Sequence, residues 1–392
     1  MQKVLLVVFE GLASTVIDSQ VLVHARTMRE HDICDIEVWS FAPTPRLYRE
    51  SLAKQAHAEQ LSASRVRVFP ALRPAIPLSV TLNAMMLRFL VWRRGKKFAL
   101  WHARTDYAAA VCAHADPKRR RGLIWDVRGE CVSEFVVRHR NTAPWLRPLV
   151  LRRLGQTIAE QRLAGARCTK AIFVSQGMAR IKRGLVTAGE VHVIPSVAAE
   201  TLFYFDAALR ERMRRDLGIA PAQRVLVYCG SINIFQRFGD IIDRFLSLHR
   251  ADPRWHLLVL TPHTDEAMRL LAAAPAGTFQ VHGVALERVN DYLNAADTAI
   301  LLLHGSRRDR VGSPVKFAEY GLAGLPVIMN TVNKDYAALA REARNFRDAD
   351  ADAGGESIVP LSNGERQRVA GFYREHLSRQ ASIAKYRDLY ST

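Results

Sequence analysis

The segment GSPVKFAEYGLAGLPVIMN, residues 312–330, combines a predicted helix start with side chains that suit an anion. Pro314 suits the first turn of a helix and Ser313 suits its N-cap, so a helix is predicted to begin near Pro314. The free N–H groups of such a helix start, with Lys316 close behind, favour a diphosphate. Glu319, further along the helix, could then accept hydrogen bonds from a ribose diol. An ordinary capped helix with a solvated Lys and Glu is the alternative.

Apolar runs rich in β-branched residues alternate with helix-compatible segments through most of the chain. The strands predicted in the first half are KVLLVVF, DIEVWSF, RVRVF, FALWHA, LIWDV, AIFVS and VHVIP. A second alternation runs from RVLVYCG to LPVIMN, and the chain ends in predicted helices after about residue 363. This pattern predicts an α/β protein with parallel sheets covered by helices.

Length favours two domains, because 392 residues exceed the usual size of one hydrophobic core. The alternation weakens between Val197 and Gln223, which places the predicted boundary there. The predicted domains are 1–198 and 199–363, with residues 364–392 as C-terminal helices that pack towards the N-terminal domain.

Several common classes of protein lack support in the sequence. Apolar residues at 49% and charged residues at 24% are globular averages and exclude a disordered or collagen-like chain. No GxGxxG, GxxxxGK[ST], GxSxG or HExxH motif occurs, so dinucleotide, P-loop, hydrolase and zinc-protease functions are not indicated. The five scattered cysteines indicate neither a disulfide framework nor a zinc site.

The stretch PVKFAEYGLAGLPVI resembles the donor-binding motif of retaining GT-B glycosyltransferases of family 4. RVLVYCGSINIFQRFGDIIDRF resembles the first strand and phosphate-facing loop of that family's C-terminal domain, and FQVHGVALERVNDYLNAADTAILL resembles its base-binding loop. LWHARTDYAAAVC and LIWDVRGECVSEF resemble a bacterial surface-polysaccharide group. The resemblance covers nearly the whole chain. It implies two Rossmann-like doubly wound domains that face a central cleft, with C-terminal helices crossing back.

Residue by residue, the resemblance implies that Glu319 binds ribose while Lys316 and Arg237 neutralise the diphosphate. Cations there would stabilise the leaving nucleoside diphosphate in the transition state, which would make a metal unnecessary. No cofactor is expected beyond the donor itself, a UDP- or GDP-sugar. The other expected donor contacts are Gly11, Ser14, Gly230, Ser231, His282, Gly283, Asp309, Ser313, Pro314 and Val315.

The sequence departs from the family pattern at two places. The first glutamate of the family's pair, which contacts the donor sugar, is replaced by Val311, and Asp309 and Arg310 are candidate substitutes. The usual lysine-glycine is replaced by Arg237 and Phe238. Arginine keeps the positive charge and adds a planar fork, so phosphate binding is still expected.

Polar side chains follow two neighbouring strands predicted in the N-terminal domain. His102 and Arg104 come at the end of FALWHA, and Asp126, Arg128 and Glu130 come at the end of LIWDV. His102 and Arg128 are the predicted catalytic residues here besides Lys316, with His102 donating to a donor-sugar hydroxyl. Arg104, Asp126 and Glu130 are expected on the acceptor side. A satisfied polar network without a catalytic role is the alternative.

Positive charge is concentrated in the first half of the chain. Residues 1–200 hold 31 Lys and Arg against 16 Asp and Glu, whereas residues 201–392 hold 25 against 22. LNAMMLRFLVW followed by the basic run 93–97 predicts peripheral binding to an anionic bilayer. The basic runs 118–122 and 138–140 could equally be solvated faces. Neither a signal peptide nor a transmembrane helix is predicted, so the expected location is the cytoplasmic face of the inner membrane.

The resemblance implies a retaining, metal-independent glycosyltransferase. It would move a sugar from a nucleoside-diphosphate sugar to a glycan or polyprenyl-phosphate-linked acceptor in bacterial capsule, exopolysaccharide or lipopolysaccharide synthesis. An anionic membrane surface is an expected partner and nucleic acid is not, because no RNA-binding motif accompanies the charge. Two alternatives stay open: a GT-B nucleotide-sugar epimerase, and a non-catalytic polyanion-binding protein with steep salt dependence.

Overall fold

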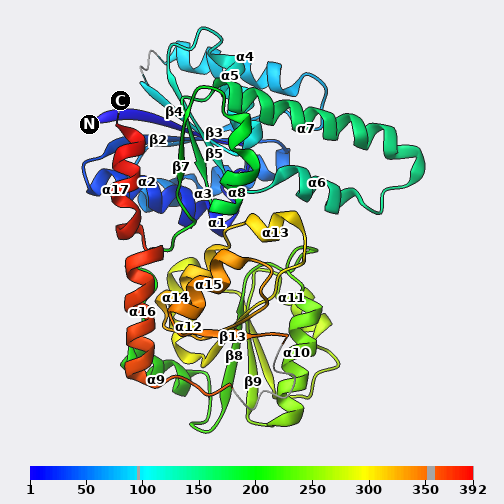
Figure 1. The fold of residues 1–392 in the computed structure, drawn as a ribbon, viewed down its shortest axis with the longest axis vertical. Helices are drawn as coiled ribbons and strands as arrows, with labels where there is room; N and C mark the ends of the chain where they lie inside the picture. Colours follow the sequence, from blue (N-terminus) through cyan, green and yellow to red (C-terminus); the bar gives the residue numbers. More distant parts are fainter. Residues whose placement is uncertain (95–97, 351–357, 392) are drawn as a thin grey trace. The chain divides into compact units, whose positions relative to one another are not determined.

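The computed structural model describes residues 1–94, 98–350 and 358–391 (Figure 1). The chain forms two compact units. The first unit contains residues 1–195, 311–313 and the chain from 382 onward, and the second contains residues 196–310 and 314–381. The expected terminal segment 364–392 is therefore divided, because helix α16 (Asn363–Leu377) lies in the second unit and most of α17 (Arg379–Tyr390) lies in the first.

The first unit is built on a seven-stranded parallel sheet of order β3-β2-β1-β4-β5-β6-β7. Its strands are β1 (Gln2–Val8), β2 (Cys34–Ala42), β3 (Val66–Pro70), β4 (Leu100–Arg104), β5 (Gly122–Val127), β6 (Lys170–Phe173) and β7 (Glu190–Val193). Because β1 neighbours β4, the connections that follow these two strands run in opposite directions. This is the switch point at which parallel sheets bind ligands.

Helices cover both faces of this sheet, so the side chains of β1 from Val4 onward are buried and apolar on both sides of the strand. Leu5 and Val7 enter one core layer, while Val4, Leu6 and Val8 enter the other. The helical segments are α1 (Thr15–Ile17), the π-helical η1 (Asp18–Leu22), α2 (Val23–Glu30), α3 (Pro45–Ser62), α4 (Ser79–Arg93), α5 (Asp106–Ala115), α6 (Cys131–His139), η2 (Pro144–Leu146), α7 (Arg147–Arg167), α8 (Gln176–Lys182) and η3 (Arg183–Leu185), besides α17.

The second unit repeats this plan with a six-stranded parallel sheet of order β10-β9-β8-β11-β12-β13. Its strands are β8 (Arg224–Cys229), β9 (Trp255–Leu260), β10 (Phe279–His282), β11 (Thr298–Leu301), β12 (Val327–Met329) and β13 (Phe346–Asp348). Its switch point lies between β8 and β11. The expected α/β class with two doubly wound parallel sheets is confirmed.

Eight helices are described in the second unit, and two core layers again flank the sheet. They are α9 (Ala207–Asp216), α10 (Phe238–Ala251), α11 (Thr264–Leu270), α12 (Leu286–Ala295), α13 (Arg307–Val311), α14 (Val315–Leu322), α15 (Lys334–Glu342) and α16. The sequence patterns did not predict α15 and β13, and β13 (FRD) contains a single apolar residue, so it shows no apolar run.

Helix α14, which begins with the candidate anion-binding residues, is held by close packing against α16. A Cβ added at Gly321 would lie 2.0 Å from the ring of Tyr373. Arg366 of α16 is buried, and its guanidinium donates to the carbonyls of Ala296 and Ala323 at 2.9 Å each. These bonds help to satisfy carbonyl groups just beyond α12 and α14, and the Ala296 carbonyl also accepts from Arg210 at 2.6 Å.

We expect Gly321→Ala to destabilise the second unit by about 1–3 kcal/mol, because the added methyl group has no space against Tyr373. Gly371→Ala in α16 is the matched control, since nothing lies within 4 Å of its Cβ position. This control should be neutral or stabilising by about 1 kcal/mol. Urea unfolding measures both, and equal stability of the two variants would contradict the packing argument.

Candidate functional site

In the second unit, the end of β8 and the start of α14 meet at the switch point of the sheet. Gly230 follows β8 with a φ of +146°, and a Cβ there would lie 2.6 Å from Nζ of Lys316. Only glycine therefore allows this approach. The structure thus brings together three residues expected at the donor diphosphate, namely Gly230, its neighbour Ser231, and Lys316.

Lys316 is partly buried and its ammonium group has two partners within the unit. Nζ donates to Oε1 of Gln236 at 2.7 Å and lies 4.6 Å from the ring centre of Tyr228. Gln236 belongs to the loop between β8 and α10. Sequence reasoning missed it, because an isolated glutamine in a loop carries no motif. Its amide oxygen occupies one direction in which Lys316 could bind an anionic oxygen.

Glu319 lies one turn after Lys316 on α14 and is 9% exposed. Burial raises the pKa of Glu319 to about 7, an effect that the Lys316 charge opposes. Burial lowers the pKa of Lys316 to about 8, and the nearby Glu319 opposes that shift in turn. Near neutral pH this helix turn thus holds a carboxylate and an ammonium group that are both close to titration.

The start of α14 differs from its expected form. Pro314 is the N-cap residue and Val315 is the first helical residue. The predicted N-cap role of Ser313 is therefore wrong, because Ser313 lies one position too early. The N-cap residue makes no side-chain hydrogen bond to the first N–H groups of α14, and a helix start of this kind suits an anion.

Other residues expected at the donor are already engaged. Arg237 donates to Asp240 at 2.8 Å and to the carbonyl of Leu303 at 3.2 Å. Asp309 is buried and accepts from Ser306 at 2.7 Å and from Arg308 at 2.9 Å. Asp309 therefore stabilises the start of α13, and its carboxylate is not free to replace the family glutamate at Val311.

His282 and Gly283 end β10, at the edge of the sheet away from the Lys316 turn. The His282 ring lies 3.2 Å from the Gln280 side chain and 5.1 Å from the Tyr292 ring centre, and burial lowers its pKa. The His282 carbonyl accepts from Thr261 N at 2.9 Å. Among the described residues, His282 therefore contacts Gln280, Tyr292 and Thr261, and it does not contact Lys316.

The polar residues of the first unit gather at the ends of β4 and β5. His102 Nε2 lies 3.2 Å from Asp126 Oδ2, and Arg128 Nε donates to the same oxygen at 2.8 Å. His102 Nδ1 lies 2.6 Å from the hydroxyl of Tyr390, which comes from α17. Burial raises the pKa of Asp126, but the charge of Arg128 and the His102 hydrogen bond outweigh this effect and keep the pKa low.

The expected contact between His102 and a donor sugar has no support in this geometry. His102 is 1% exposed, and both of its ring nitrogens have protein partners. Asp126 and Arg128 form a largely buried ion pair. Two atoms of this pair, Asp126 Oδ1 and Arg128 Nη1, are buried without a hydrogen-bond partner among the described residues, and the same holds for Nη1 of Arg104.

The remaining predicted residues of the first unit have structural contacts. Glu130 caps α6 by accepting from Ser133 N at 2.7 Å. Gly11, after β1, has a φ of +67°, and a Cβ there would lie 2.6 Å from Leu47. Ser14 is exposed, and its oxygen accepts from Val16 N at 3.2 Å. Gly11 and Ser14 therefore shape the loop after β1 at the switch point of this sheet.

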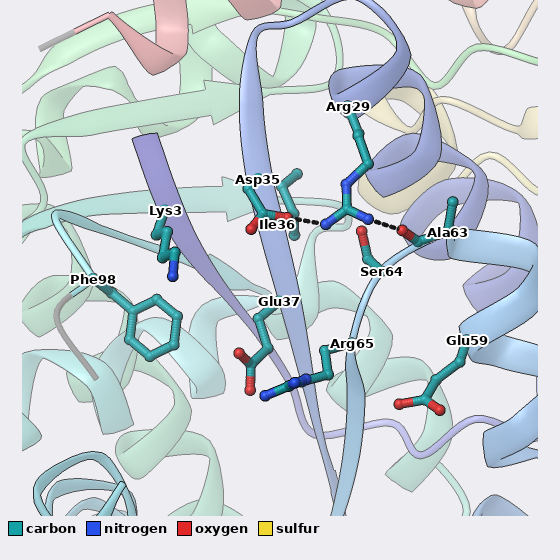
Figure 2. Close-up of a pocket in the computed structure, with 10 residues that line it drawn as sticks. All are labelled: Lys3, Arg29, Asp35, Ile36, Glu37, Glu59, Ala63, Ser64, Arg65 and Phe98. Atoms are coloured by element: carbon teal, nitrogen blue, oxygen red, sulfur yellow. Dashed lines mark hydrogen bonds and ion pairs between the residues drawn. The ribbon is translucent and has the colours of Figure 1, made fainter. Parts of the chain in front are cut away.

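A pocket of about 530 Å³ lies at the opposite edge of the first sheet, where its strands begin (Figure 2). Lys3, Asp35 and Phe98 lie at or just before the amino ends of their strands. Arg29 reaches from α2 to Asp35 and to the carbonyl of Ala63. This pocket is not at the carboxyl edge that parallel sheets use for ligands, so it is not the candidate active site.

Neither a protein-family model nor a curated protein sequence matches the chain. Solved structures do match it along its length. The sucrose-phosphate synthase of Thermosynechococcus elongatus has a TM-score of 0.71 and 14% identity, with 100% of this chain and 98% of that chain covered. HepE of Anabaena, solved with UDP and glucose, has a TM-score of 0.65 and 14% identity, with 100% of both chains covered.

A third similar structure is that of WaaG, a glycosyltransferase involved in lipopolysaccharide biosynthesis. Its TM-score is 0.67 at 12% identity, with 99% of each chain covered. At such identities the similarity shows the fold. The two-unit fold of this chain is that of GT-B glycosyltransferases.

We expect Asp126→Asn to destabilise the protein by about 3–5 kcal/mol at pH 7, because it leaves Arg128 as a buried charge without its carboxylate. The low pKa of Asp126 in the folded state adds stability above the unfolded value of about 4, and this stability is lost as the pH falls below it. Urea unfolding between pH 7 and pH 2.5 should therefore show a steeper acid loss for the wild type than for the variant. Parallel pH profiles would contradict this role of Asp126.

Proposed function

We propose that the chain is a retaining glycosyltransferase that uses a nucleoside-diphosphate sugar, with UDP-sugars as the first candidates. The observation that carries the proposal is the turn of α14 in which Lys316 and Glu319 lie beside Gly230. Solved structures of similar fold that hold UDP or UDP-glucose support UDP as the nucleotide to test first.

In the proposed complex the diphosphate lies at the start of α14. The first backbone N–H groups and the Lys316 ammonium group supply positive potential, and a phosphate oxygen replaces Gln236 Oε1 as the partner of Nζ. The Glu319 carboxylate accepts from the two ribose hydroxyls. A Gly230 backbone without Cβ lets the diphosphate approach as closely as Lys316 now does.

In this proposal Lys316 accelerates the transfer because it lies where negative charge develops on the donor. As the glycosidic bond breaks, charge grows on the leaving diphosphate, and a cation already placed there binds the transition state more tightly than the ground state. In this proposal Lys316 supplies that stabilisation without a metal, and retention needs no protein nucleophile. The acceptor, a glycan or polyprenyl-phosphate-linked sugar of bacterial surface-polysaccharide synthesis, is assigned to the side of Arg104, Asp126 and Arg128.

The proposed transferase works at an anionic membrane surface through α4. The helix leaves Leu82, Met85, Phe89 and Trp92 exposed on one face, with Trp92 at 75%, and its N-cap residue Leu78 is also exposed, at 72%. The opposite face is buried in the core.

The charge around α4 also suits an anionic membrane surface. No Asp or Glu occurs between Glu59 and Asp106, while Arg88, Arg93 and Arg94 are exposed on or just after α4. Residues 95–97 of the basic run lie outside the described residues. Across the ranges that the structure describes, no helix is both long enough and apolar enough to span a bilayer.

A thermal-shift series with UDP, GDP, ADP, dTDP and CMP tests the donor site, because a ligand that binds only the folded state raises the Tm. We expect UDP to raise it and Glu319→Ala to weaken UDP binding by about 100-fold through loss of two charge-assisted hydrogen bonds. Glu211→Ala, at an exposed glutamate of the same unit, is the control. No shift with any nucleotide, together with salt-sensitive binding of polyanions, would favour the polyanion-binding alternative.

The affinity for UDP should depend on pH in a bell shape. Below about 7 Glu319 takes up a proton and no longer accepts from the ribose, and above about 8 Lys316 loses the proton that attracts the diphosphate. Titration calorimetry from pH 6 to 9 measures both limbs. Glu319→Gln should abolish the acid limb and Lys316→Arg the alkaline limb, whereas an unchanged bell in both variants would disprove this assignment.

Vesicle sedimentation tests the membrane surface. The protein should bind vesicles that contain phosphatidylglycerol more tightly than vesicles of phosphatidylcholine alone. Phe89→Ala with Trp92→Ala should weaken this binding at least about tenfold, because two large apolar side chains no longer enter the interface. The exposed pair Met268→Ala with Leu270→Ala in the second unit is the control. Equal binding by the two double variants would contradict the role of α4.

A further inference from the structure

The last helix of the chain, α17, is part of the core of the first unit. Tyr386, Leu389 and Tyr390 are buried in the same apolar layer as Val4 and Leu6 of β1. Tyr390 is 2% exposed, yet its hydroxyl has two polar partners from other elements. It lies 3.0 Å from His24 Nε2 and 2.6 Å from His102 Nδ1. The tyrosine hydroxyl is both a donor and an acceptor, so it can link the two histidines.

These contacts continue into the polar residues at the end of β5. From Tyr390 the hydrogen bonds run through His102 to Asp126 Oδ2, which also accepts from Arg128. Tyr386, one turn before Tyr390, is hydrogen bonded to Arg128. Two tyrosines on one face of α17 thus contact both residues that hold Asp126.

The hydrogen bonds of this chain fix the His102 ring on both sides. Asp126 is ionised and can only accept, so Nε2 of His102 carries a proton and donates to Oδ2. On the other side of the ring, Nδ1 lies 2.6 Å from the Tyr390 hydroxyl, which also lies 3.0 Å from His24 Nε2. Tyr390 and Asp126 therefore hold the ring between them.

This arrangement leaves one carboxylate oxygen of Asp126 without a hydrogen-bond donor among the described residues. Oδ2 is held by His102 and Arg128, whereas Oδ1 is buried and has no partner among the described residues. A buried carboxylate oxygen without a donor is costly unless a ligand or a water supplies one. Asp126 and Arg128 also lie at the carboxyl edge of the sheet, where a ligand is expected.

We propose that Tyr390 is a positioning residue that holds the His102 ring against Asp126 and thereby fixes Asp126 with Oδ1 directed to a substrate hydroxyl. The hydroxyl is that of the acceptor, a sugar in transfer and a water molecule in donor hydrolysis, so this inference rests on the proposed function. It assigns to the C-terminal helix a role in the active site, and it makes His102 an internal support of Asp126 rather than a residue that touches the sugar.

Tyr390→Phe tests the inference, because it removes one oxygen and keeps the ring in the core. Tyr373→Phe is the matched control: Tyr373 is also buried, and its hydroxyl donates to Asn345 at 3.2 Å in the second unit. Histidine ring ¹⁵N spectra report the hydrogen bonding of each ring nitrogen, and His102→Gln identifies the His102 signals by their loss. We expect Tyr373→Phe to leave the His102 signals at their wild-type positions, and Tyr390→Phe to shift and broaden them, because Nδ1 loses its partner and the ring is held on one side only.

Release of UDP from UDP-glucose, with water as the acceptor, supplies the functional readout. Tyr390→Phe should lower kcat about tenfold and leave KM within about twofold, since the second unit binds the nucleotide. Tyr373→Phe should change neither. Unchanged His102 spectra in Tyr390→Phe overturn the inference, and so do equal kcat values for the two variants. A wild type that releases no UDP counts against the proposed function instead, while the spectra still decide the role of Tyr390.

Discussion

Two groups of functional residues, Lys316 with Glu319 and Asp126 with Arg128, depend on one constraint. It is the parallel pairing of β8 with β11 and of β1 with β4. Neighbouring parallel strands need long crossover connections, and at these two pairs the crossovers run to opposite sides of the sheet. The loops after β1 and β8 therefore diverge from the loops after β4 and β11. Polar side chains can occupy the space between them without entering a core layer. Gly11, Gly230 and Asp126 all lie at or beside these strand ends.

In the second unit, this geometry allows the partly buried ammonium group of Lys316 and the buried carboxylate of Glu319 to lie on the same helix turn. Lys316 and Glu319 both lose solvation at the start of α14, and each partly compensates the other. Gln236 and the Tyr228 ring complete the surroundings of the ammonium group. Gly321, by contact with Tyr373, and Arg366, by satisfying carbonyl groups, hold the same helix from behind. Tight packing on one side of α14 thus keeps a polar turn in place on the other side.

In the first unit, residue type alone was a poor guide to role. His102, Arg104, Asp126, Arg128 and Glu130 were all expected at a ligand, and the structure separates them. His102 and Glu130 are buried and bonded within the protein, whereas Asp126, Arg128 and Arg104 each have a buried atom without a hydrogen-bond partner among the described residues. The decisive contact of His102 comes from Tyr390, 288 positions away in the chain. No local pattern could reveal that contact, because a C-terminal helix with apolar spacing predicts packing and says nothing of a particular hydroxyl.

The sequence by itself determined the class of fold and the places of chemistry. Buried parallel strands must be apolar on both faces, so their runs and the intervening helices are visible in the order of residues, as are the charges of the helix turn at Lys316 and Glu319. Tertiary structure alone decided which polar atoms are free. Asp309 and Arg237 proved to be engaged by neighbours, Ser313 proved not to be the N-cap residue of α14, and Gln236 proved to bind Lys316. The physical reason is that a side chain's role depends on which of its hydrogen-bonding atoms are already satisfied, and the partners come from distant segments that only folding brings together.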